Sequence, residues 1–284
     1  VQAAFAQFVV RPSDQIPVLT QSGQTLDFPW TGGLNAVDVS TFDADFDGED
    51  DDIYIFDKAG NRSLVFVGDV IDGERRYSYS PELSRSFPPM MSWALLRDYD
   101  CDGRKDLFTY STVGGAISVY RNVGSMAGPA WELAETVLLS YYDFGSTNYT
   151  TNIYCSSQDV PAIFDYDGDG DLDIITANVG GTFLEFHFNQ SVETGNGCGL
   201  GNFELANRCY GGFLEGQESN EIILDPAIVA QSCTFNVVNP KSGVGGTSGY
   251  KEGARHVGAT ILARDFNDDG LIDLVLGDAG YSNL

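Results

Sequence analysis

The chain has 284 residues, enough for one large β domain or two ordinary domains with buried cores. Its formal net charge of −26, without any cluster of basic residues, excludes a nucleic-acid-binding protein. The 14 tyrosines and 18 phenylalanines against three methionines, with 33 glycines, favour strands and tight turns over helices. No run reaches the ~18 apolar residues of a spanning helix, so no transmembrane segment is predicted.

The N-terminal residues suggest export. Ala4-Phe-Ala6 before Gln7 has the A-x-A form of a signal-peptidase site, so residues 1–7 are predicted to be a signal-peptide remnant or a short disordered leader. Phe8-Val9-Val10 and Leu26-Asp-Phe-Pro-Trp30, separated by Pro and Gly turns, predict one or two strands that lead into an acidic loop.

Four acidic segments follow one pattern, with oxygen-bearing side chains at the first, third and fifth positions, glycine at the sixth and an acid at the ninth. The clearest is Asp165-Tyr-Asp-Gly-Asp-Gly-Asp-Leu-Asp173, and the others begin at Asp43, Asp98 and Asp265. The first copy has one extra residue, so either Asp51 or Asp52 could be its closing acid.

This spacing is typical of a site for a hard cation. Calcium takes six to eight oxygen ligands at roughly 2.3–2.6 Å, and alternate residues of a tight loop can direct several oxygens to one centre. The sixth-position glycine allows the positive φ that the loop needs. The EF-hand loop starts in the same way but closes with a glutamate at its twelfth position and leads into a helix. Here β-forming residues follow the ninth position, so the sequence predicts about four calcium ions, each in a loop that enters a strand.

Calcium is also predicted to stabilise the fold, because the metal-free loops would repel themselves. The competing interpretation is that Asp and Gly simply favour turns. Repetition of the same spacing four times, each time before a strand-like run, favours the metal.

A β-hairpin is predicted after each of the first three loops, with a Gly-containing turn between its strands. The predicted strand pairs are Ile53–Phe56 with Ser63–Val67, Leu107–Tyr110 with Ala116–Asn122, and Ile174–Ala177 with Thr182–Asn189. Strand-only repeats of this length predict propeller blades. Residues at about 190–256 contain no acidic loop but are rich in glycine, and they are predicted to be an insertion in one blade or a degenerate blade without metal.

The five cysteines match no zinc pattern and suit an oxidising, extracellular compartment. Cys198 and Cys209 flank a short Gly-rich loop and are predicted to form a disulfide. Cys101 is predicted to reach Cys155, which leaves Cys233 without a partner.

No catalytic motif is present. Of the two histidines, His187 alternates with phenylalanines in a predicted strand and is expected to be structural, and His256 lies in a Gly-rich approach to the fourth loop. Exposed aromatic residues could form a carbohydrate platform or pack against the hairpins; they are Tyr77, Tyr79, Tyr141, Tyr142 and Tyr149.

The unit D-x-D-x-D-G-x-x-D-[LI], followed by a strand and a Gly-Gly hairpin, resembles FG-GAP or VCBS repeats, the calcium-binding blades of integrin-like seven-bladed propellers. The resemblance covers roughly residues 30–190 and 257–284. Trp30-Thr-Gly-Gly-Leu-Asn35, Phe56-Asp-Lys-Ala-Gly-Asn61, Trp93-Ala-Leu-Leu-Arg-Asp-Tyr-Asp-Cys-Asp-Gly103 and Arg255-His-Val-Gly-Ala-Thr260 are similar to secreted VCBS-repeat proteins of Bacteroidetes-type bacteria. Such proteins typically carry a C-terminal sorting domain for the type IX secretion system.

The resemblance implies a set of metal ligands. The side-chain ligands would be Asp43, Asp45, Asp47, Asp98, Asp100, Asp102, Asp106, Asp165, Asp167, Asp169, Asp173, Asp265, Asn267, Asp269 and Asp273, with Asp51 or Asp52 closing the first loop. The seventh-position residues Glu49, Arg104, Asp171 and Leu271 would contribute backbone carbonyls.

The resemblance further implies an all-β fold in which residues 8–284 form blades of a seven-bladed propeller, with the insertion at about 190–256. The implied function is a secreted or cell-surface adhesion or interaction module that binds an extracellular protein or glycan and is handled by the secretion machinery of the outer membrane. The alternative is a propeller-fold polysaccharide lyase or hydrolase, or a lectin.

Overall fold

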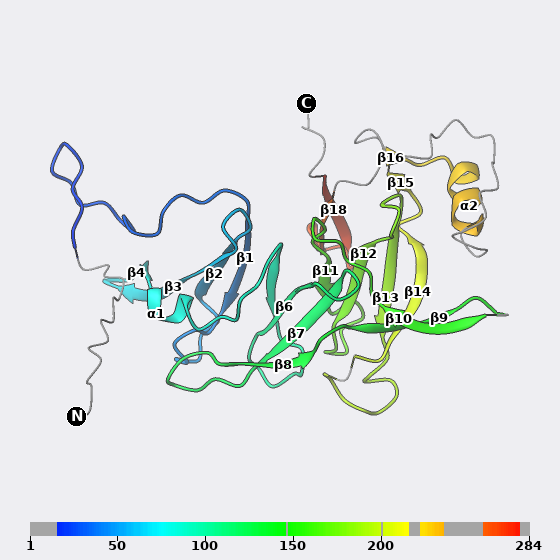
Figure 1. Cartoon of the computed structure of the whole chain (residues 1–284), viewed down its shortest axis with the longest axis horizontal. Helices are drawn as coiled ribbons and strands as arrows, with labels where there is room; N and C mark the ends of the chain where they lie inside the picture. The colour runs from blue at the N-terminus through cyan, green and yellow to red at the C-terminus, as the bar shows by residue number, and fades with distance from the viewer. Residues whose placement is uncertain (1–15, 146, 200, 216–221, 236–257, 279–284) are drawn as a thin grey trace, which may run out of the picture. The chain divides into compact units, whose positions relative to one another are not determined.

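The computed structural model describes residues 16–145, 147–199, 201–215, 222–235 and 258–278. The protein is all-β over these residues, as predicted, with small antiparallel sheets and two helices, α1 (Pro81–Ser84) and α2 (Pro226–Phe235) (Figure 1). The chain forms two compact units, the first of residues Val1–Pro88 with Gly124–Pro129 and the second of residues Pro89–Val123 with Ala130–Leu284.

The first unit contains one four-stranded antiparallel sheet. Its strands are β1 (Val37–Phe42), β2 (Asp52–Asp57), β3 (Arg62–Ile71) and β4 (Glu74–Tyr79), which pair in sequence order. Residues of β1 alternate between exposed and buried, as the two-residue period of a strand requires. Phe42 and Tyr54 lie in the core, where the Tyr54 ring stacks on Phe87 with centroids 4.4 Å apart.

The region before β1 differs from the prediction. Residues 26–30 form turns instead of a strand, because Phe28 has a φ of 50° and Pro29 cannot donate a ladder hydrogen bond. The predicted strand at Phe8-Val9-Val10 lies outside the described residues.

The second unit repeats the same sheet order. One sheet contains β5 (Ala94–Arg97), β6 (Asp106–Ser111), β7 (Ala116–Asn122) and β8 (Trp131–Glu135). The next contains β11 (Ala162–Phe164), β12 (Asp173–Ala177), β13 (Leu184–Asn189) and β14 (Phe203–Tyr210), and it is extended by β9 (Leu139–Asp143) and β10 (Asn148–Asn152). In this six-stranded sheet β14 pairs in parallel with β9.

Two short sheets complete the described secondary structure. The strands β17 (Ala259–Arg264) and β18 (Asp273–Asp278) form an antiparallel pair, and so do β15 (Leu214–Glu215) and β16 (Ile222–Ile223). The described strands do not close into a barrel or a propeller.

The sheets of the second unit pack against one another through strand β12, which is buried along its whole length. Ile174 lies in a core cluster with Phe108 of β6 and Ile117 of β7. The next residue, Ile175, points to the other face and lies in a cluster with Ile261 of β17. The β11–β14 sheet is therefore covered on both faces, which explains why the adjacent residues Ile174 and Ile175 of β12 are both apolar.

The three predicted hairpins are confirmed as β2–β3, β6–β7 and β12–β13. Each acidic loop joins an edge strand of a sheet to the strand that pairs with it: β1 to β2, β5 to β6, β11 to β12, and β17 to β18. Within the predicted insertion, residues Phe203–Tyr210 form β14 and pair with β13, so they belong to the repeated sheet. Residues 236–257, which include the end of the predicted insertion, lie outside the described residues.

The predicted disulfides are wrong. Cys101 bonds to Cys198, and Cys209 bonds to Cys233, while Cys155 is unpaired and buried. Cys155 lies in the core between the β5–β8 and β11–β14 sheets, where it cannot reach Cys101 in its surface loop. Among the described helices, none is long and apolar enough to cross a membrane.

Candidate metal sites

The four acidic loops share one backbone conformation. In each loop the first acid accepts a hydrogen bond from the amide of the sixth-position glycine: Asp43 from Gly48 at 2.9 Å, Asp98 from Gly103 at 3.0 Å, Asp165 from Gly170 at 3.0 Å, and Asp265 from Gly270 at 2.8 Å. Each of these glycines has a positive φ, between 83° and 101°. The predicted role of the sixth glycine is therefore confirmed in all four copies.

The fifth acid fixes the next turn in the same way. Its carboxylate accepts the amide of the seventh residue at 2.9 Å in every copy: Asp47 from Glu49, Asp102 from Arg104, Asp169 from Asp171, and Asp269 from Leu271. These side-chain-to-backbone bonds mimic a turn and hold the loop folded back on itself. The carbonyls of the seventh residues remain predicted ligands.

A requirement at the fourth position was missed by the sequence prediction. This residue also has a positive φ in each loop: Phe46 at 63°, Cys101 at 57°, Gly168 at 83° and Asp268 at 60°. Three of these four residues are not glycine, so the residue type at the fourth position does not indicate a positive φ. The surrounding hydrogen bonds impose it, because side chains other than glycine adopt it at a cost.

The closing acid braces the loop to the sheet. Both oxygens of Asp106 accept backbone hydrogen bonds, one from Tyr99 at 2.8 Å and the other from Asn122 at 2.7 Å, and the side chain is almost completely buried. Asp173 bonds in the same way to Tyr166 and Asn189. In the fourth loop Asp273 accepts from Phe266 at 3.1 Å.

The same pattern resolves the choice in the first loop. Asp52 accepts from Ala44 at 2.6 Å and from Gly68 at 2.7 Å, and it is buried. Asp51 instead forms an ion pair with Arg75. Asp52 is therefore the structural equivalent of Asp106 and Asp173.

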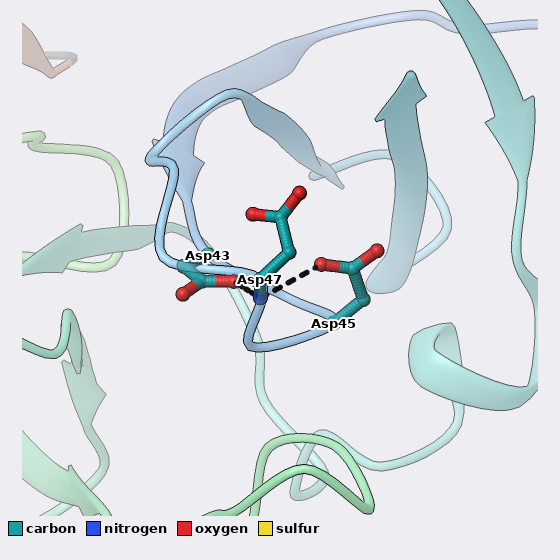
Figure 2. Close-up of side chains that lie close together, drawn as sticks. All are labelled: Asp43, Asp45 and Asp47. Carbon is teal, nitrogen blue, oxygen red and sulfur yellow. Dashed lines mark hydrogen bonds between the residues drawn. The ribbon is translucent and has the colours of Figure 1, made fainter. Parts of the chain in front are cut away.

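Three loops bring carboxylates close enough to share an ion. These carboxylates form four groups of three residues, and within each group one carboxylate oxygen per residue lies within 4.8 Å of the other two. The groups are Asp43, Asp45 and Asp47; Asp98, Asp100 and Asp106; Asp165, Asp167 and Asp173; and Asp167, Asp169 and Glu193. Figure 2 shows the first group, in which Asp43 and Asp45 both accept the amide of Asp47. Carboxylate oxygens at such separations suit a hard divalent cation.

The fourth loop forms no such carboxylate group among the described residues. Its third position is Asn267, whose amide nitrogen donates to Asp269 at 3.1 Å. The amide group therefore occupies one oxygen of Asp269. This loop places fewer carboxylate oxygens close together than the other three do.

Unpaired oxygens in the second and third loops fit a cation. Asp98 Oδ1, Asp100 Oδ1 and Asp169 Oδ2 are buried atoms with no hydrogen-bond partner among the described residues. A buried carboxylate oxygen without a partner is costly, and metal coordination removes that cost. The residues present thus fit a resident hard cation.

The raised pKa values of carboxyl groups in the second and third loops also fit a bound cation. Burial raises the pKa of Asp106 to about 6 and that of Asp173 to about 7. Neighbouring carboxylates also raise both pKa values, whereas the backbone hydrogen bonds lower them. Burial likewise raises the pKa of Asp98 and, to about 6, that of Asp171. A bound cation would favour the ionised form of each group.

Two arginines reduce the negative charge of the second loop. Arg104, at its seventh position, forms an ion pair with Asp102, and its Nε donates to the Asn122 carbonyl at 2.8 Å. Arg121 of β7 places Nε 3.2 Å from Asp100. Because the third loop has no such cation at its seventh position, it presents the stronger negative field.

Glu193 is a further acidic residue that the sequence prediction missed. It belongs to the turn that follows β13, and its carboxylate lies with Asp167 and Asp169 of the third loop. In the same turn the amide of Val192 donates to Asp171 at 3.0 Å. No spacing rule links Glu193 to the loop motif, so only the fold reveals the proximity.

The histidine and aromatic predictions have mixed outcomes. His187 is fully buried, and its Nδ1 lies 3.0 Å from Ser140 Oγ, as expected of a structural residue. Burial lowers its pKa to about 3. Tyr142 is also buried and stacks on Tyr149, so it does not belong to an exposed platform. His256 lies outside the described residues.

No protein-family model, no curated protein and no solved structure matches this chain.

Proposed function

We propose that this protein is a calcium-binding β-propeller, or part of one, whose loops each hold an ion. The observation that carries the proposal is the identical hydrogen-bond pattern of four loops, three of which gather carboxylates within 4.8 Å. Calcium is the favoured cation because the donors are all oxygens and the loops are long enough for six or more ligands.

The propeller proposal is supported by the repetition of one sheet. Three sheets carry the same meander of four antiparallel strands, and β17 with β18 corresponds to the first two strands of another copy. In the second unit these sheets pack face to face through apolar clusters. Blades of a propeller pack in this way.

The proposed location is extracellular or on the cell surface. Two disulfides and a strongly acidic composition are compatible with an oxidising, calcium-rich compartment. There the rigid sheets would act as an adhesion or interaction module for a protein or glycan, and export would use the type IX route. Comparing secretion by a type IX-competent bacterium with that by a secretion-deficient strain tests the route, and equal release from both would contradict it.

A groove in the first unit favours a lectin-like version of this function. It has a volume of about 330 Å³, and its lining includes Trp30, Tyr77 and Tyr79 together with Asp27. The Trp30 ring is half exposed and is held by a hydrogen bond from its Nε1 to the Ile16 carbonyl at 2.9 Å. Flat aromatic faces beside a carboxylate suit a sugar ring, which presents apolar C–H groups and hydroxyls.

Calcium dependence is tested by thermal unfolding in millimolar calcium and in excess chelator. At a calcium concentration 100 times the dissociation constant, each occupied site adds about 2.7 kcal/mol to the free energy of unfolding. We expect a clear rise in the unfolding midpoint with calcium and little response to magnesium. An unchanged midpoint would reject the metal-binding function.

A glycan array that compares the wild type with Trp30→Ala tests the lectin version.

A further inference from the structure

The Gly-rich segment after β13 connects two of the acidic loops. We call residues 195–199, 201 and 202 the strap. A hydrogen bond joins the end of the strap to the residue that follows β13: the amide of Gln190 donates to the Asn202 carbonyl at 3.0 Å. Cys198 of the strap forms the disulfide with Cys101, the fourth residue of the second loop, 97 positions earlier in the chain. The strap is thus covalently attached to a proposed metal site.

The backbone of the strap lies directly against the second loop. A Cβ atom added to Gly199 would lie only 2.7 Å from the Cβ of Asp100, the third-position ligand of that loop. A Cβ added to Gly201 would lie 2.8 Å from the Tyr99 hydroxyl. Only glycine permits the approach at position 199, so Gly199 places the strap against the ligand-bearing backbone, and Gly201 lies against the Tyr99 side chain.

The same disulfide also lies against the third loop. The Cys101 sulfur is 3.1 Å from the carbonyl oxygen of Gly170, and the Cys198 sulfur would be 3.9 Å from a Cβ at that glycine. Gly170 is the sixth residue of the third loop and donates its amide to Asp165, the first ligand there. One cystine therefore contacts the backbones of two loops.

A charged side chain reinforces the connection. Arg121 of β7 places Nε 3.2 Å from Asp100 and donates from Nη2 to the Gly199 carbonyl at 3.4 Å. The guanidinium thus joins the strap to the same ligand that the strap backbone covers. Movement of the strap would alter the position of Asp100.

We propose that the Cys101–Cys198 disulfide holds the second loop in its cation-binding conformation and couples it to the third loop, so that cation affinity at both loops depends on this bond. The proposal rests on the calcium-binding function proposed above. Cys101 has a φ of 57°, like the fourth residues of the other loops, and the disulfide adds a covalent restraint to the hydrogen bonds of this loop. Losing the bond would free both the fourth residue of one loop and the contact with Gly170 of the other.

Reduction would switch the bond chemically. A dithiol reductant supplies two electrons and two protons, the S–S bond breaks into two thiols, and the reductant becomes a cyclic disulfide. The second disulfide, Cys209–Cys233, joins β14 to α2 and provides a matched control within the same chain.

The test is calcium titration by calorimetry of the full chain. Asp98→Asn and Asp165→Asn assign the measured sites to the second and third loops. We expect C101S/C198S to weaken binding at the second loop tenfold or more and at the third loop severalfold, with C209S/C233S unchanged. Affinities within twofold of the wild type at the second loop, or an unchanged third loop, would overturn the proposal.

A further variant separates the cross-link from the turn. C101G/C198S supplies a residue that accepts positive φ but no disulfide, so we expect its binding to remain weakened. Recovery of wild-type affinity would show that the turn alone suffices and would overturn the role of the bond.

If C101S/C198S does not fold, the same question can be asked of folded protein. In C209S/C233S loaded with calcium, dithiothreitol can break only the Cys101–Cys198 bond, and we expect calcium release that a chelator-competition dye reports. Retention of all bound calcium after complete reduction would overturn the proposal but leave the calcium-binding function standing. Absence of binding by the oxidised wild type would overturn both.

Discussion

The carboxylate of Asp106 accepts a hydrogen bond from the backbone amide of Asn122, sixteen residues further along the chain, at 2.7 Å. The bond joins the end of the second acidic loop to the last residue of β7, across the hairpin. Pairs with the same separation recur in the other complete sheets: Asp52 with Gly68, and Asp173 with Asn189. The closing acid therefore has a structural role in addition to its proposed contact with the ion.

We expect Asp106→Ala to destabilise the protein even without metal. The substitution leaves two buried amides, those of Tyr99 and Asn122, without their acceptor, which costs about 2 kcal/mol or more in free energy of unfolding. Urea unfolding in excess chelator measures this cost. The control is Glu132→Ala on the exposed side of β8, which should change stability by less than about 0.5 kcal/mol. Equal stability of the two variants in chelator would contradict the bracing role.

The first loop offers a comparison of two adjacent acids. Asp52→Asn replaces one of the two acceptor oxygens by an NH2 donor, which leaves the amide of either Ala44 or Gly68 without its acceptor, so we expect a loss of about 1–3 kcal/mol in free energy of unfolding. Asp51→Asn removes only a partly exposed ion pair with Arg75, which contributes about 0–1 kcal/mol. Chemical denaturation of both variants distinguishes them. A larger loss for Asp51→Asn would show that the closing position is assigned to the wrong residue.

The acidic loops and the hairpins after them could be predicted because their determinants are local. The sixth-position glycines, such as Gly170, and the apolar run of β12 lie within a few residues of the motif. The strands that begin and end each sheet were harder to predict. β5 has only four residues, and β14 is separated from β13 by a long turn, so neither produces a clear period in the sequence.

The disulfide pairing was predicted wrongly because it depends on contacts between parts of the chain that are distant in sequence. Cys198 and Cys209 are close in sequence, but the chain reverses between them, with Cys198 in the strap and Cys209 on β14. Which cysteines form disulfides therefore depends on which loops the fold brings together, and the spacing of cysteines along the sequence does not show this. The proximity of Glu193 to the third loop likewise depends on the packing of the turn after β13.

A glycine substitution isolates the cost of the loop conformation. A Cβ atom at Gly48 would touch nothing within 4 Å, but its φ is 98°, so Gly48→Ala introduces backbone strain without a clash. We expect a loss of about 1–2 kcal/mol in free energy of unfolding. Gly33→Ala is the matched control, since that residue is equally free of contacts and its φ is not positive. Control and test variants of equal stability would contradict the strained conformation of the loop.

Stability should also depend on pH through Glu185. Burial raises the pKa of this carboxyl to about 7, while the charge of Arg208 opposes the rise. In the unfolded chain the pKa of a glutamate is about 4.3. Between these two values the folded protein binds more protons at Glu185 than the unfolded chain does. The free energy of unfolding therefore falls as the pH rises through this window, and the loss is complete above about pH 7.

Glu185→Gln keeps the volume of the side chain and removes the titration. We expect the stability of this variant relative to the wild type to be higher at pH 8 than at pH 5, by about 1 kcal/mol or more, because only the wild type must ionise a buried carboxyl. Urea unfolding at both pH values, at one fixed calcium concentration, measures the difference and cancels the titration of the acidic loops. Glu132→Gln, exposed on β8, serves as the control and should follow the wild type. Parallel pH profiles for the wild type and Glu185→Gln would show that Glu185 ionises in the folded protein as easily as in water.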